Sequence, residues 1–540
     1  MKAQCLPFSQ IPHTTRLFAD FLSWAPAIQR FYPRSPHFEQ WLNHEAPNER
    51  YDPARREQVA AILERQNRDF GASVKAQENL GRFRAGASAV VTGQQVGLFG
   101  GPVFSIYKAL TAIKLAEQAT KAGVDCVPVF WLATTDHDLA EVNHIFIPGP
   151  DGIRRELATP THSVDDAPVS AITFGEEISP VVQEAAELLG DSVATSALRE
   201  AYRPGENFGG AFARLFAQLF ANYGVVLVEA SDPELNAIAA PIYRSALERA
   251  AELDEALLAR GRELEAQGYH QQVKVTPSST LLFALQSGSR MPIHRRLNGA
   301  HADEEFLIGE EAVPRTELFR RIEAEPGKFS PNVLLRPVIQ DYLFPTLAYT
   351  GGSAEVAYFA QAEVPYRTLL GHVTPIVPRF SATLIEAKPQ SLLERYSLSL
   401  PDLFNGPEAA REALAKRALP QDLQSAFDQA DILVKNSMAK IQDSLDRLDK
   451  TLVEAAANAQ SKMQHQLDQL RSRAARAELR QSEVLNRHAD LLSNALYPNK
   501  SLQERETAAI YFLGRYGLEL VDEVYKALHT DCLDHQVISL

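Results

Sequence analysis

The chain has 540 residues, of which 45% are hydrophobic and 23% are charged, and its formal net charge is −14 at pH 7. This length exceeds one ordinary hydrophobic core, so we expect two or three domains with the composition of a soluble globular protein. The acidic balance excludes a general nucleic-acid or membrane-surface binder, because such a protein would carry a basic face.

The N-terminal segment has no uninterrupted apolar run like that of a secretory signal, and no segment reaches ~18 apolar residues. The three cysteines, Cys5, Cys126 and Cys532, are widely spaced and odd in number. They therefore indicate neither a disulfide framework nor a zinc site. The simplest expectation is a protein of the reducing cytoplasm with no membrane partner.

A strand–helix–strand unit follows a charged N-terminal region, in which Phe18–Tyr32 and Arg56–Phe70 are candidate helices. The apolar stretch ASAVVTG predicts a buried strand that runs into a glycine-rich bend. Apolar residues at helical spacing from Ile106 to Ile113 then predict a helix. The stretch CVPVFWLA predicts a second buried strand, and such a unit is the seed of a parallel α/β sheet.

A second unit of the same kind comes later in the chain. Apolar residues from Phe208 to Phe220 form one helix face, VVLVEA predicts a buried strand, and the turn at 231–233 caps the next helix. Residues 150–200, between the two units, are polar and irregular in pattern, which predicts an insertion. Residues 270–380 mix short strands with turns rich in proline and glycine.

From Gln421 to Tyr497 the chain contains no glycine and no proline. Apolar residues alternate at spacings of four and three from Ile441 to Ala459, slip by one residue near Met463, and resume from Leu467 to Ala477. This pattern predicts a long coiled-coil helix or helix pair whose apolar seam needs a partner helix. The partner helix is either intramolecular or belongs to a second subunit.

The sequence TGQQVGLFGGP joins the first strand to its helix. Glycines let a backbone approach an anion, and the helix N-terminus that follows offers unpaired N–H groups. Gln94 and Gln95 stand at the carboxyl end of the strand, where parallel sheets bind ligands; Lys108 is either part of this site or solvated. If the loop binds an anion, a valine at Gly101 should block the ligand before it blocks folding. Alternatively, the glycines only satisfy a tight turn, and neither a P-loop nor a GxGxxG motif is present.

The sequence TTDHDLAEVNH follows the second apolar strand, where a site is again expected. A carboxylate beside an imidazole can hold its tautomer and support proton transfer, so Asp136, His137 and Asp138 are candidates for catalysis or substrate binding. His144 stands seven residues after His137. A metal site is a weaker alternative, because the spacing is not HExxH and no thiolate is near. A hydrogen-bonded structural cluster is the third possibility.

Arg336, Gln340 and Asp341 are polar residues in the otherwise apolar run from Ser330 to Gln361. A buried arginine needs a partner, which is either an internal carboxylate or the carboxylate or phosphate of a ligand. The basic-hydroxyl turn from Arg379 to Ser381 ends another short strand and is a weaker candidate for contact with phosphate.

Four long segments stand in a fixed order: TGQQVGLFGGPVFSIYKA, VPVFWLATTDHDLAEVNH, SPNVLLRPVIQDYLFPTLAYTGG and SLQERETAAIYFLGRYG. Together they resemble the bacillithiol-biosynthesis cysteine-adding enzymes. The resemblance spans nearly the whole chain, with a coiled-coil-like segment before the last motif, and residues 150–200 match poorly. The core of that family is similar to class I aminoacyl-tRNA synthetases, whose HxGH and lysine-rich signatures are absent here.

The resemblance implies an α/β fold, with a Rossmann-like parallel sheet core, connecting inserts and a long α-helical coiled-coil domain. It implies a core over residues 1–385 with an insert at approximately 150–200, a coiled-coil domain over 386–495, and a C-terminal segment, 496–540, that returns to the core. It also implies a homodimer that forms through the coiled coil.

The implied activity is a ligase that joins the carboxyl group of cysteine to the amine of glucosaminyl-malate, the last step of bacillithiol biosynthesis. Because an amide does not form downhill from a free carboxylate, ATP would activate the carboxyl group as an adenylate or an acyl phosphate, with ADP as a candidate bound product. Neither nucleic acid nor a membrane is an expected partner, and the metal requirement stays open. The alternatives are another class I-like nucleotidyl transferase or a non-catalytic coiled-coil assembly protein.

The candidate residues then fall into three expected roles. Asp136, His137 and Asp138 would hold the attacking amine and carry the catalysis. Substrate binding is assigned to Gln94, Gln95, Asn143, His144, Arg336, Gln340 and Asp341, with Arg336 on an anionic group such as the malate carboxylate. Nucleotide binding is assigned to Thr92, Gly93, Gly97, Gly100, Gly101, Ser105, Lys108, Arg379 and Ser381. No metal ligand is assigned.

Overall fold

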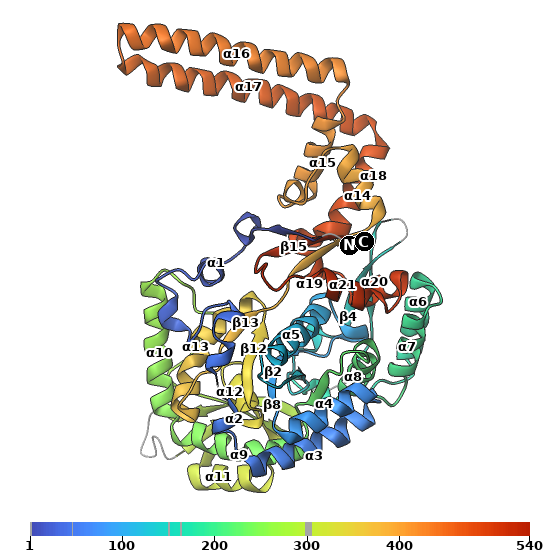
Figure 1. Ribbon diagram of the computed structural model, residues 1–540, viewed down its shortest axis with the longest axis vertical. Coiled ribbons are helices and arrows are strands. Elements are labelled where there is room, and N and C mark those ends of the chain that lie inside the picture. The colour runs from blue at the N-terminus through green and yellow to red at the C-terminus, as the bar shows by residue number, and fades with distance from the viewer. Residues whose placement is uncertain (1–2, 46, 150–151, 162–164, 298–304) are drawn as a thin grey trace.

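The protein is built around a parallel β-sheet at the centre of the lower body in Figure 1. The computed structural model describes residues 3–45, 47–149, 152–161, 165–297 and 305–540. Five parallel strands lie in the order β13–β12–β2–β3–β6. Their bounds are Ser88–Gln94 (β2), Cys126–Leu132 (β3), Val226–Glu229 (β6), Thr346–Gly351 (β12) and Ile376–Pro378 (β13). The predicted Rossmann-like α/β class is therefore confirmed, and the similarity to class I synthetases stays a prediction.

β2 and β3 are buried almost throughout, because helices cover both faces of the sheet. α5, Phe104–Lys121, connects β2 to β3, and α8, Phe208–Leu219, leads into β6. Asp232 caps α9, Pro233–Glu248, and accepts hydrogen bonds from the first N–H groups of that helix. Both predicted strand–helix units are confirmed.

The strand order determines where a ligand site can form. The chain runs outward from β2 through β3 to β6, and then returns to the other side of β2 for β12 and β13. The loops after β2 and β12 therefore leave the sheet in opposite directions. They open a crevice at the carboxyl ends of these two strands, which is where doubly wound sheets bind ligands.

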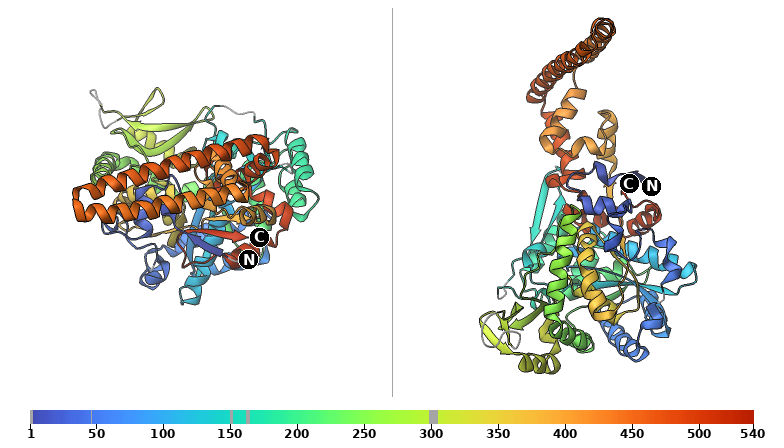
Figure 2. Two further views of the ribbon diagram at one scale, coloured as in Figure 1. Left: turned by 90° about the horizontal axis from the view of Figure 1, so that it is seen from above. Right: turned by 90° about the vertical axis from the view of Figure 1, so that its left-hand side faces the viewer.

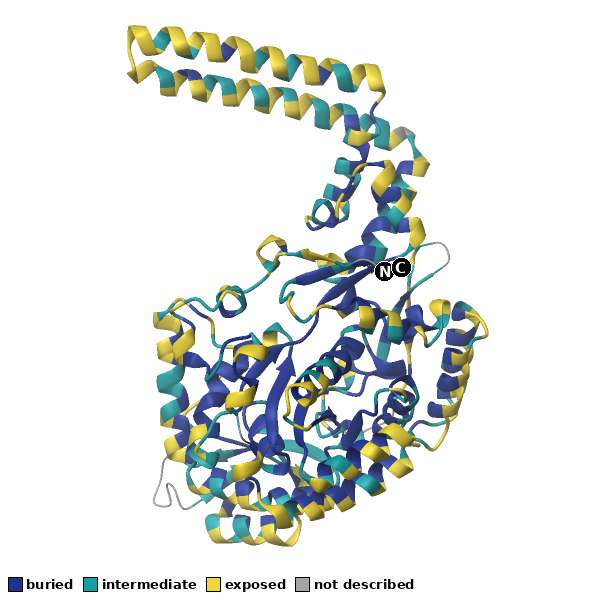
Figure 3. Cartoon of the chain, in the orientation of Figure 1, coloured by how far each residue is buried: buried dark blue, intermediate teal, exposed yellow. Residues whose placement is uncertain are grey.

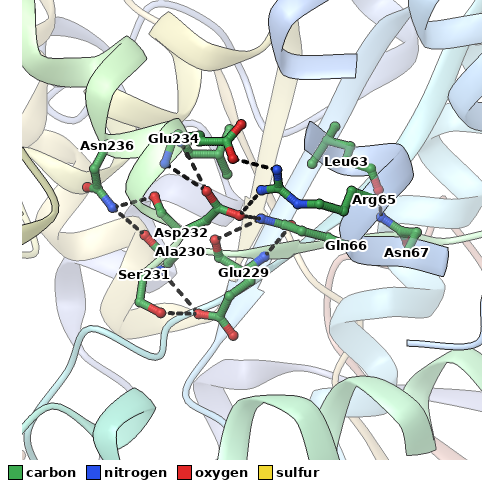
Figure 4. A network of polar contacts seen from close by, with 11 residues as sticks. Leu63, Arg65, Gln66, Asn67, Glu229, Ala230, Ser231, Asp232, Glu234 and Asn236 are labelled. Atoms are coloured by element: carbon green, nitrogen blue, oxygen red, sulfur yellow. Dashed lines mark hydrogen bonds and ion pairs between the residues drawn. The ribbon is translucent and has the colours of Figure 1, made fainter. Parts of the chain in front are cut away.

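A network of hydrogen bonds connects helix α3, Pro53–Asp69, to the edge strand β6 (Figure 4). The side chain of Asn67 donates to the carbonyl of Leu227 at 2.8 Å and accepts its N–H at 3.0 Å, as a neighbouring strand would. Gln66 accepts the N–H of Glu229 at 2.9 Å. Side-chain amides thus occupy the hydrogen-bonding groups of an edge that a further strand would otherwise cover.

The predicted helix over Phe18–Tyr32 is wrong beyond Leu22. α1 spans Arg16–Leu22, and the chain then turns, because Trp24 adopts a φ of 51° and Pro26 has no N–H to donate. The second predicted helix is confirmed as α3, and a further helix, α4, Val74–Ala85, follows it.

The prediction of an irregular stretch at 150–200 is wrong in its second half. α6, Ile178–Leu189, and α7, Val193–Ala201, are regular helices whose apolar faces pack in the same core as α8. Polar residues fill their outer faces, so both helices are amphipathic and their helical period was present in the sequence but was missed. Residues 150–151 and 162–164 of this stretch lie outside the described residues.

Two antiparallel sheets flank the parallel one. β4, His144–Pro148, pairs with β5, Arg154–Ala158. The larger sheet has the order β10–β9–β8–β7–β11. Its strands are Ser279–Gln286 (β7), Ser289–Arg295 (β8), Glu305–Ile308 (β9), Glu311–Pro314 (β10) and Phe329–Pro331 (β11). The short strands expected between residues 270 and 380 are confirmed.

The remaining helices of the core surround these sheets. The C-terminal helices α19, α20 and α21 return to the core after the helical arm (Figure 1). The bounds are Pro47–Arg50 (α2), Ala250–Ala266 (α10), Arg315–Ala324 (α11), Arg336–Leu343 (α12), Ser353–Leu370 (α13), Gln503–Glu506 (α19), Ala509–Tyr516 (α20) and Leu520–Ala527 (α21). Among the described residues, no helix has both the length and the apolar composition needed to cross a membrane.

The two ends of the chain meet in a third small sheet (Figure 1). β15, His535–Ser539, lies between β1, Ala3–Leu6, which is antiparallel to it, and β14, Ala382–Ile385, which is parallel. A disulfide joins Cys5 to Cys532, 527 positions later in the sequence. This pair corrects the expectation that the cysteines form no disulfide; the sheet brings them together, and their spacing gave no sign of it.

A helical arm projects from the core (Figures 1 and 2). Two long antiparallel helices form its outer part, and three shorter ones form its base. The bounds are Ala387–Arg395 (α14), Pro407–Arg417 (α15), Gln421–Leu448 (α16), Thr451–Gln481 (α17) and Glu483–Leu496 (α18). Figure 3 shows that most of the surface of α16 and α17 is exposed, in contrast to the core.

The arm confirms the predicted helix pair and shows that the partner helix is intramolecular, since α16 packs along α17. The predicted continuous seam from Ile441 to Ala459 is wrong. The chain reverses at Asp449 and Lys450, and Asp449 adopts an extended conformation there. No glycine or proline marks this reversal, so the heptad pattern runs through it unbroken.

Candidate functional site

Polar residues from several motifs lie at the carboxyl edge of the parallel sheet. The segment after β3 carries one group, the crevice between β2 and β12 holds a second, and the ends of β12 and β13 border a third. We call the first two groups the His137 cluster (Asp136, His137 and Arg290) and the crevice network (Lys108, Arg336, Tyr349, Glu355 and Tyr358). The third is the Arg379 pocket, a cavity lined by Arg379, Ser381, Arg505 and the N-terminus of α13.

The His137 cluster comes directly after β3. The carboxylate of Asp136 accepts the backbone N–H of His137 at 2.9 Å and the side-chain amide of Gln95 at 3.1 Å. Arg290 donates to Nδ1 of His137 at 3.1 Å and lies 3.5 Å from Oδ1 of Asp136. The structure therefore brings together two of the predicted site segments, the one after β2 and the one after β3.

Arg290 is a site residue that the sequence motifs did not indicate. It stands on β8, and its side chain is only 9% exposed. The guanidinium also donates to Oγ of Ser330 at 3.0 Å and to the carbonyl of Pro331 at 2.9 Å, and it lies 3.8 Å from the ring centre of Phe283. Burial lowers the pKa of Arg290 to about 10. One arginine in a short antiparallel strand is too common a feature to single out from sequence.

The contact with Arg290 determines which nitrogen of His137 carries the proton. A guanidinium has donors and no acceptor, so Nδ1 must accept, and the proton of the neutral imidazole is on Nε2. Nε2 lies 3.9 Å from Oδ1 of Asp166, and the His137 side chain is 33% exposed. His137 therefore offers an N–H donor to a ligand that approaches over the strand ends.

The crevice network is centred on a buried ion pair. Nζ of Lys108 lies 2.9 Å from Oε2 of Glu355 and donates to the carbonyl of Gly93 at 2.7 Å and to Oε1 of Gln94 at 2.8 Å. Burial lowers the pKa of Lys108 to about 8, although Glu355 opposes that shift. The alternative that Lys108 is solvated is wrong, because the side chain is 5% exposed.

Glu355 also accepts the hydroxyl of Tyr349 at 2.7 Å and the N–H of Gly352 at 2.6 Å. These bonds and the nearby Lys108 hold the pKa of Glu355 below its ordinary value, although burial acts in the opposite direction. Glu355 is therefore ionised, and its single negative charge is already satisfied by protein groups.

Arg336 adds a second positive charge beside this pair. Its guanidinium donates to the hydroxyl of Tyr358 at 2.9 Å, and among the described residues no carboxylate lies within 4.0 Å of it. The side chain borders a small cavity together with Trp131 and Thr135, next to the His137 cluster. The network thus carries two cations and one carboxylate, and the surplus positive charge suits an anionic ligand.

The Arg379 pocket is a cavity of about 330 Å³ at the ends of β12 and β13. Arg379 is 8% exposed and pairs with Glu504 at 2.8 Å, and its buried Nε has no hydrogen-bond partner in the part of the chain that the structure describes. The N-terminus of α13, from Gly352 to Ala354, and the side chain of Arg505 also line the cavity. A helix N-terminus beside two arginines is a favourable site for an anion.

Ser381 lines the same cavity, but its hydroxyl is hydrogen-bonded to a histidine. Its hydroxyl lies 2.7 Å from Nδ1 of His535, whose Nε2 lies 2.8 Å from the hydroxyl of Thr383. Burial lowers the pKa of His535 to about 4, so this histidine is neutral at pH 7. Arg379 is therefore the member of the predicted basic-hydroxyl turn with an unused hydrogen-bonding atom.

Several predicted substrate residues lie apart from these groups. Asp341 contacts Nε2 of His372 at 2.5 Å and sits near the end of α12 opposite to Arg336. Gln340 is buried, and neither of its amide atoms has a hydrogen-bond partner. Asn143 contacts His144 at 3.2 Å, and Asp138 is exposed at the start of a short turn. Their assigned roles stay predictions.

The glycine-rich loop is folded into the core. Gly97, Gly100 and Gly101 are buried, and the hydroxyl of Tyr202 accepts the N–H of Gly100 at 3.2 Å. The backbone from 507 to 509 covers the start of α5, with the N–H of Val103 donating to Thr507 at 3.0 Å. Protein groups therefore occupy part of the helix N-terminus that the sequence assigned to a nucleotide.

The remaining nucleotide candidates surround the same loop. The hydroxyl of Thr92 donates to the carbonyl of Thr350 at 2.8 Å across the crevice. Gly93 lies in β2, where a side chain would meet the carbonyl oxygen of Trp131 at 2.9 Å. The hydroxyl of Ser105 is buried without a hydrogen-bond partner. Their nucleotide roles stay predictions.

Gly101→Val is expected to lower the melting temperature and to leave the ATP affinity of the folded protein within about twofold. Gly101 has a φ of 70°, and strain at such a position costs about 1–3 kcal/mol for a non-glycine residue. Thermal melts with calorimetric ATP titration measure both effects. Gly81→Val is the matched control, because Gly81 has no positive φ and has open space around it. Lost ATP binding with an unchanged melting temperature would support an anion-binding loop instead.

The described residues contain no group of three or more histidine, cysteine, aspartate or glutamate side chains arranged to hold a metal ion. His137 and Asp136 are close, but both contact the cation of Arg290, and the carboxylate of Asp166 lies 3.9 Å from His137. The metal requirement of this protein stays open.

Comparison with known families divides the chain into two parts. Residues 1–380 match the family model "Bacillithiol biosynthesis BshC, N-terminal Rossmann-like domain", and residues 382–540 match "Bacillithiol biosynthesis BshC, C-terminal coiled-coil domain". A relative named "Putative cysteine ligase BshC" from Koribacter versatilis is 50% identical over 538 residues, with 100% of each chain covered. A relative of the same name from Solibacter usitatus is 35% identical, with 100% of each chain covered. Another from Geobacillus thermodenitrificans is 30% identical and covers 95% of this chain and 96% of its own.

Proposed function

The chain belongs to the bacillithiol biosynthesis BshC family and is a ligase, and from this premise we propose that it joins the carboxyl group of cysteine to the amine of glucosaminyl-malate. The observation that carries the proposal is the surplus of positive charge at the carboxyl edge of the sheet, where no carboxylate of the described residues lies within 4.0 Å of Arg336. The malate group of the acceptor and the phosphates of a nucleotide are both anions. We place the reaction in the cytoplasm, where cysteine and ATP are available.

The reaction needs an activated carboxyl group. We propose that cysteine attacks ATP through its carboxylate, which gives either cysteinyl adenylate with release of pyrophosphate or an acyl phosphate with release of ADP. The amine of glucosaminyl-malate then attacks the carbonyl carbon, and AMP or phosphate leaves while the amine loses a proton. Both routes concentrate negative charge that arginine and lysine side chains stabilise.

Each group at the sheet edge has a part in this scheme. The Arg379 pocket holds nucleotide phosphates, through the free Nε of Arg379 and the N-terminus of α13. Arg336 holds a carboxylate of the malate group. The His137 cluster, which directly follows β3, orients the amine, with Nε2–H of His137 and the carboxylate of Asp136 as the polar groups.

Incubation of the purified protein with cysteine, glucosaminyl-malate, ATP and magnesium tests the proposal. Mass spectrometry should detect bacillithiol, and chromatography of the nucleotides should show AMP for the adenylate route or ADP for the acyl-phosphate route. Formation of neither bacillithiol nor a nucleotide product would contradict ATP-dependent ligation by this protein alone. ATP cleavage that needs a different carboxylic acid would favour another nucleotidyl transferase.

We further propose that two copies pair through the helical arm. The hairpin leaves Ile441 and Leu448 exposed on α16, and Leu452, Met463 and Leu470 exposed on α17. Residues seven apart in a helix lie on the same face, so Ile441 and Leu448 form one apolar stripe. Exposed apolar stripes of this kind mark interaction surfaces.

Ile441→Glu together with Leu448→Glu is expected to convert a dimer into a monomer in light scattering, because the change puts two charges into the apolar interface. Ile432→Glu is the matched control. Ile432 is 57% exposed and lies nine residues before Ile441, on the opposite face of α16, so its change should leave the dimer intact. A dimer mass that survives the double change would place the subunit contact elsewhere.

A further inference from the structure

The disulfide between Cys5 and Cys532 connects the two ends of the chain at the base of the arm. The Cα atoms are 6.4 Å apart, and the pair links β1 to the segment just before β15. The third cysteine, Cys126, is buried in β3, and burial raises the pKa of its thiol. Disulfides in reducing compartments are mostly redox-active rather than structural, so this pair calls for a chemical role.

The two sulfur positions differ in access. Cys5 is exposed and borders an open groove of about 940 Å³ between the terminal sheet and the base of the arm. The groove has a mixed polar lining, which includes Gln4, Gln390 and Ser399. Cys532 is only partly exposed, and its sulfur lies 3.7 Å from the carbonyl of Asp534, which can accept a thiol hydrogen. A small thiol can therefore reach Cys5 more readily than Cys532.

The disulfide also anchors one wall of the Arg379 pocket. The segment directly after β1, from Phe8 to Phe18, lines that pocket opposite the N-terminus of α13. Three kinds of contact attach it to the C-terminal segment: the N–H of Phe8 donates to Asp534 at 3.0 Å, the Phe8 ring lies 6.2 Å from the ring of His535, and Phe8 and Ile11 share an apolar cluster with Val537. Among the described strands, β1 lies at the edge of its sheet and pairs with β15 alone. The covalent link to Cys532 is the strongest tie that this wall has to the C-terminus.

We propose that the Cys5–Cys532 pair is a thiol-exchange site, at which small thiols and their disulfides open and close the link and so loosen or fix the wall of the Arg379 pocket. The exchange chemistry stands on the geometry of the pair alone. A regulatory role for the pair rests on the proposed function. A ligase that makes a small thiol would then respond to the oxidation state of small thiols like its own product.

The exchange balances without a further reagent. The thiolate of a small thiol attacks Sγ of Cys5, which forms a mixed disulfide and releases Cys532 as a thiolate that takes up a proton. A second small thiolate attacks the outer sulfur of the mixed disulfide, which releases Cys5 and one molecule of the small disulfide. In total, two small thiols are oxidised and one protein disulfide is reduced; the reverse sequence closes the pair.

Titration of the full-length protein in cysteine/cystine buffers tests the exchange. Differential alkylation and peptide mass spectrometry should show Cys5 and Cys532 changing together with one midpoint, while Cys126 stays reduced and serves as the internal control. In Cys532→Ser, cystine should convert Cys5 to the mixed disulfide at least ten times faster than it modifies Cys532 in Cys5→Ser. Equal rates at the two positions, or independent midpoints, would overturn the proposal.

Hydrogen exchange tests the effect on the pocket wall without any activity measurement. Peptides covering residues 7–18 should exchange at least threefold faster in the reduced wild type than in the oxidised one. The double variant Cys5→Ser/Cys532→Ser should resemble the reduced protein in both buffers. If exchange at 7–18 is the same in both states, the pair does not control the wall. Redox-dependent exchange in a protein that makes no bacillithiol would leave the thiol-exchange site standing and reject only the proposed function.

Discussion

Replacing Arg336 by methionine is expected to lower kcat/KM for glucosaminyl-malate by about 10³-fold. Removing one partner of a desolvated charge pair costs about 2–5 kcal/mol, and about 4 kcal/mol corresponds to that factor. The loss should appear mainly in KM for the malate-bearing substrate, because Glu355, whose charge acts on Arg336, is already paired with Lys108. Steady-state kinetics with each substrate varied in turn measure the effect.

The melting temperature of Arg336→Met should change little, since the substitution breaks no ion pair within 4.0 Å in the described part of the chain. Arg260→Met is a matched control, for which we expect the opposite result in stability and in kinetics. Arg260 is 14% exposed and pairs with Glu363, which is 7% exposed, so its loss takes away one of the two cations, Arg260 and Arg367, that pair with this buried carboxylate. That variant should lose stability while the kinetic constants of its folded fraction are retained. A strongly destabilised Arg336→Met protein with a normal KM would show that Arg336 is structural.

His137→Ala is expected to reduce bacillithiol formation by ~100-fold or more, which is the usual range for a group that moves a proton in the transition state. The fold should be retained, because the His137 side chain is 33% exposed and lies beyond the end of β3. Single-turnover assays with thermal melts on the same preparation measure both properties.

His137→Gln separates proton transfer from hydrogen bonding. A glutamine amide donates a hydrogen bond, as Nε2–H of His137 does, but it does not act as an acid or a base at neutral pH. If His137 transfers a proton, the glutamine variant should be as slow as the alanine variant. His270→Ala is the control, because His270 is exposed and lies outside the site. Activity close to wild type in His137→Ala would remove this residue from the mechanism.

Local sequence patterns predicted the elements of the central sheet well. The apolar runs of β2 and β3 are unbroken because both faces of a parallel sheet are covered, so their burial is visible without any tertiary information. Asp232 and Pro233 likewise mark the start of α9 through bonds that form within a few residues. The predicted helix over Phe18–Tyr32 failed because the apolar spacing was given more weight than Pro26, and because Trp24 adopts a φ of 51° that the spacing does not indicate.

The candidate site was predictable only in part. Gln95 and Asp136 follow adjacent parallel strands, so their proximity could be expected once the sheet was recognised. Arg290 was missed because it arrives from an antiparallel sheet 153 residues beyond its partner His137. Asp341 was grouped with Arg336 from sequence, whereas the length of α12 separates them and His372 becomes the partner of Asp341.

The sequence by itself determined what depends on neighbouring residues: the apolar strands, the capped helices, the helical arm and the motifs that show the family. The tertiary structure alone decided which distant groups share a space. It placed Lys108 against Glu355, set Arg336 against the hydroxyl of Tyr358, turned the arm back at Asp449 and joined Cys5 to Cys532. The physical reason is that secondary structure is fixed largely by interactions within a few residues. Charge pairing, burial and disulfide contact depend instead on packing between segments hundreds of residues apart, and no local period records that packing.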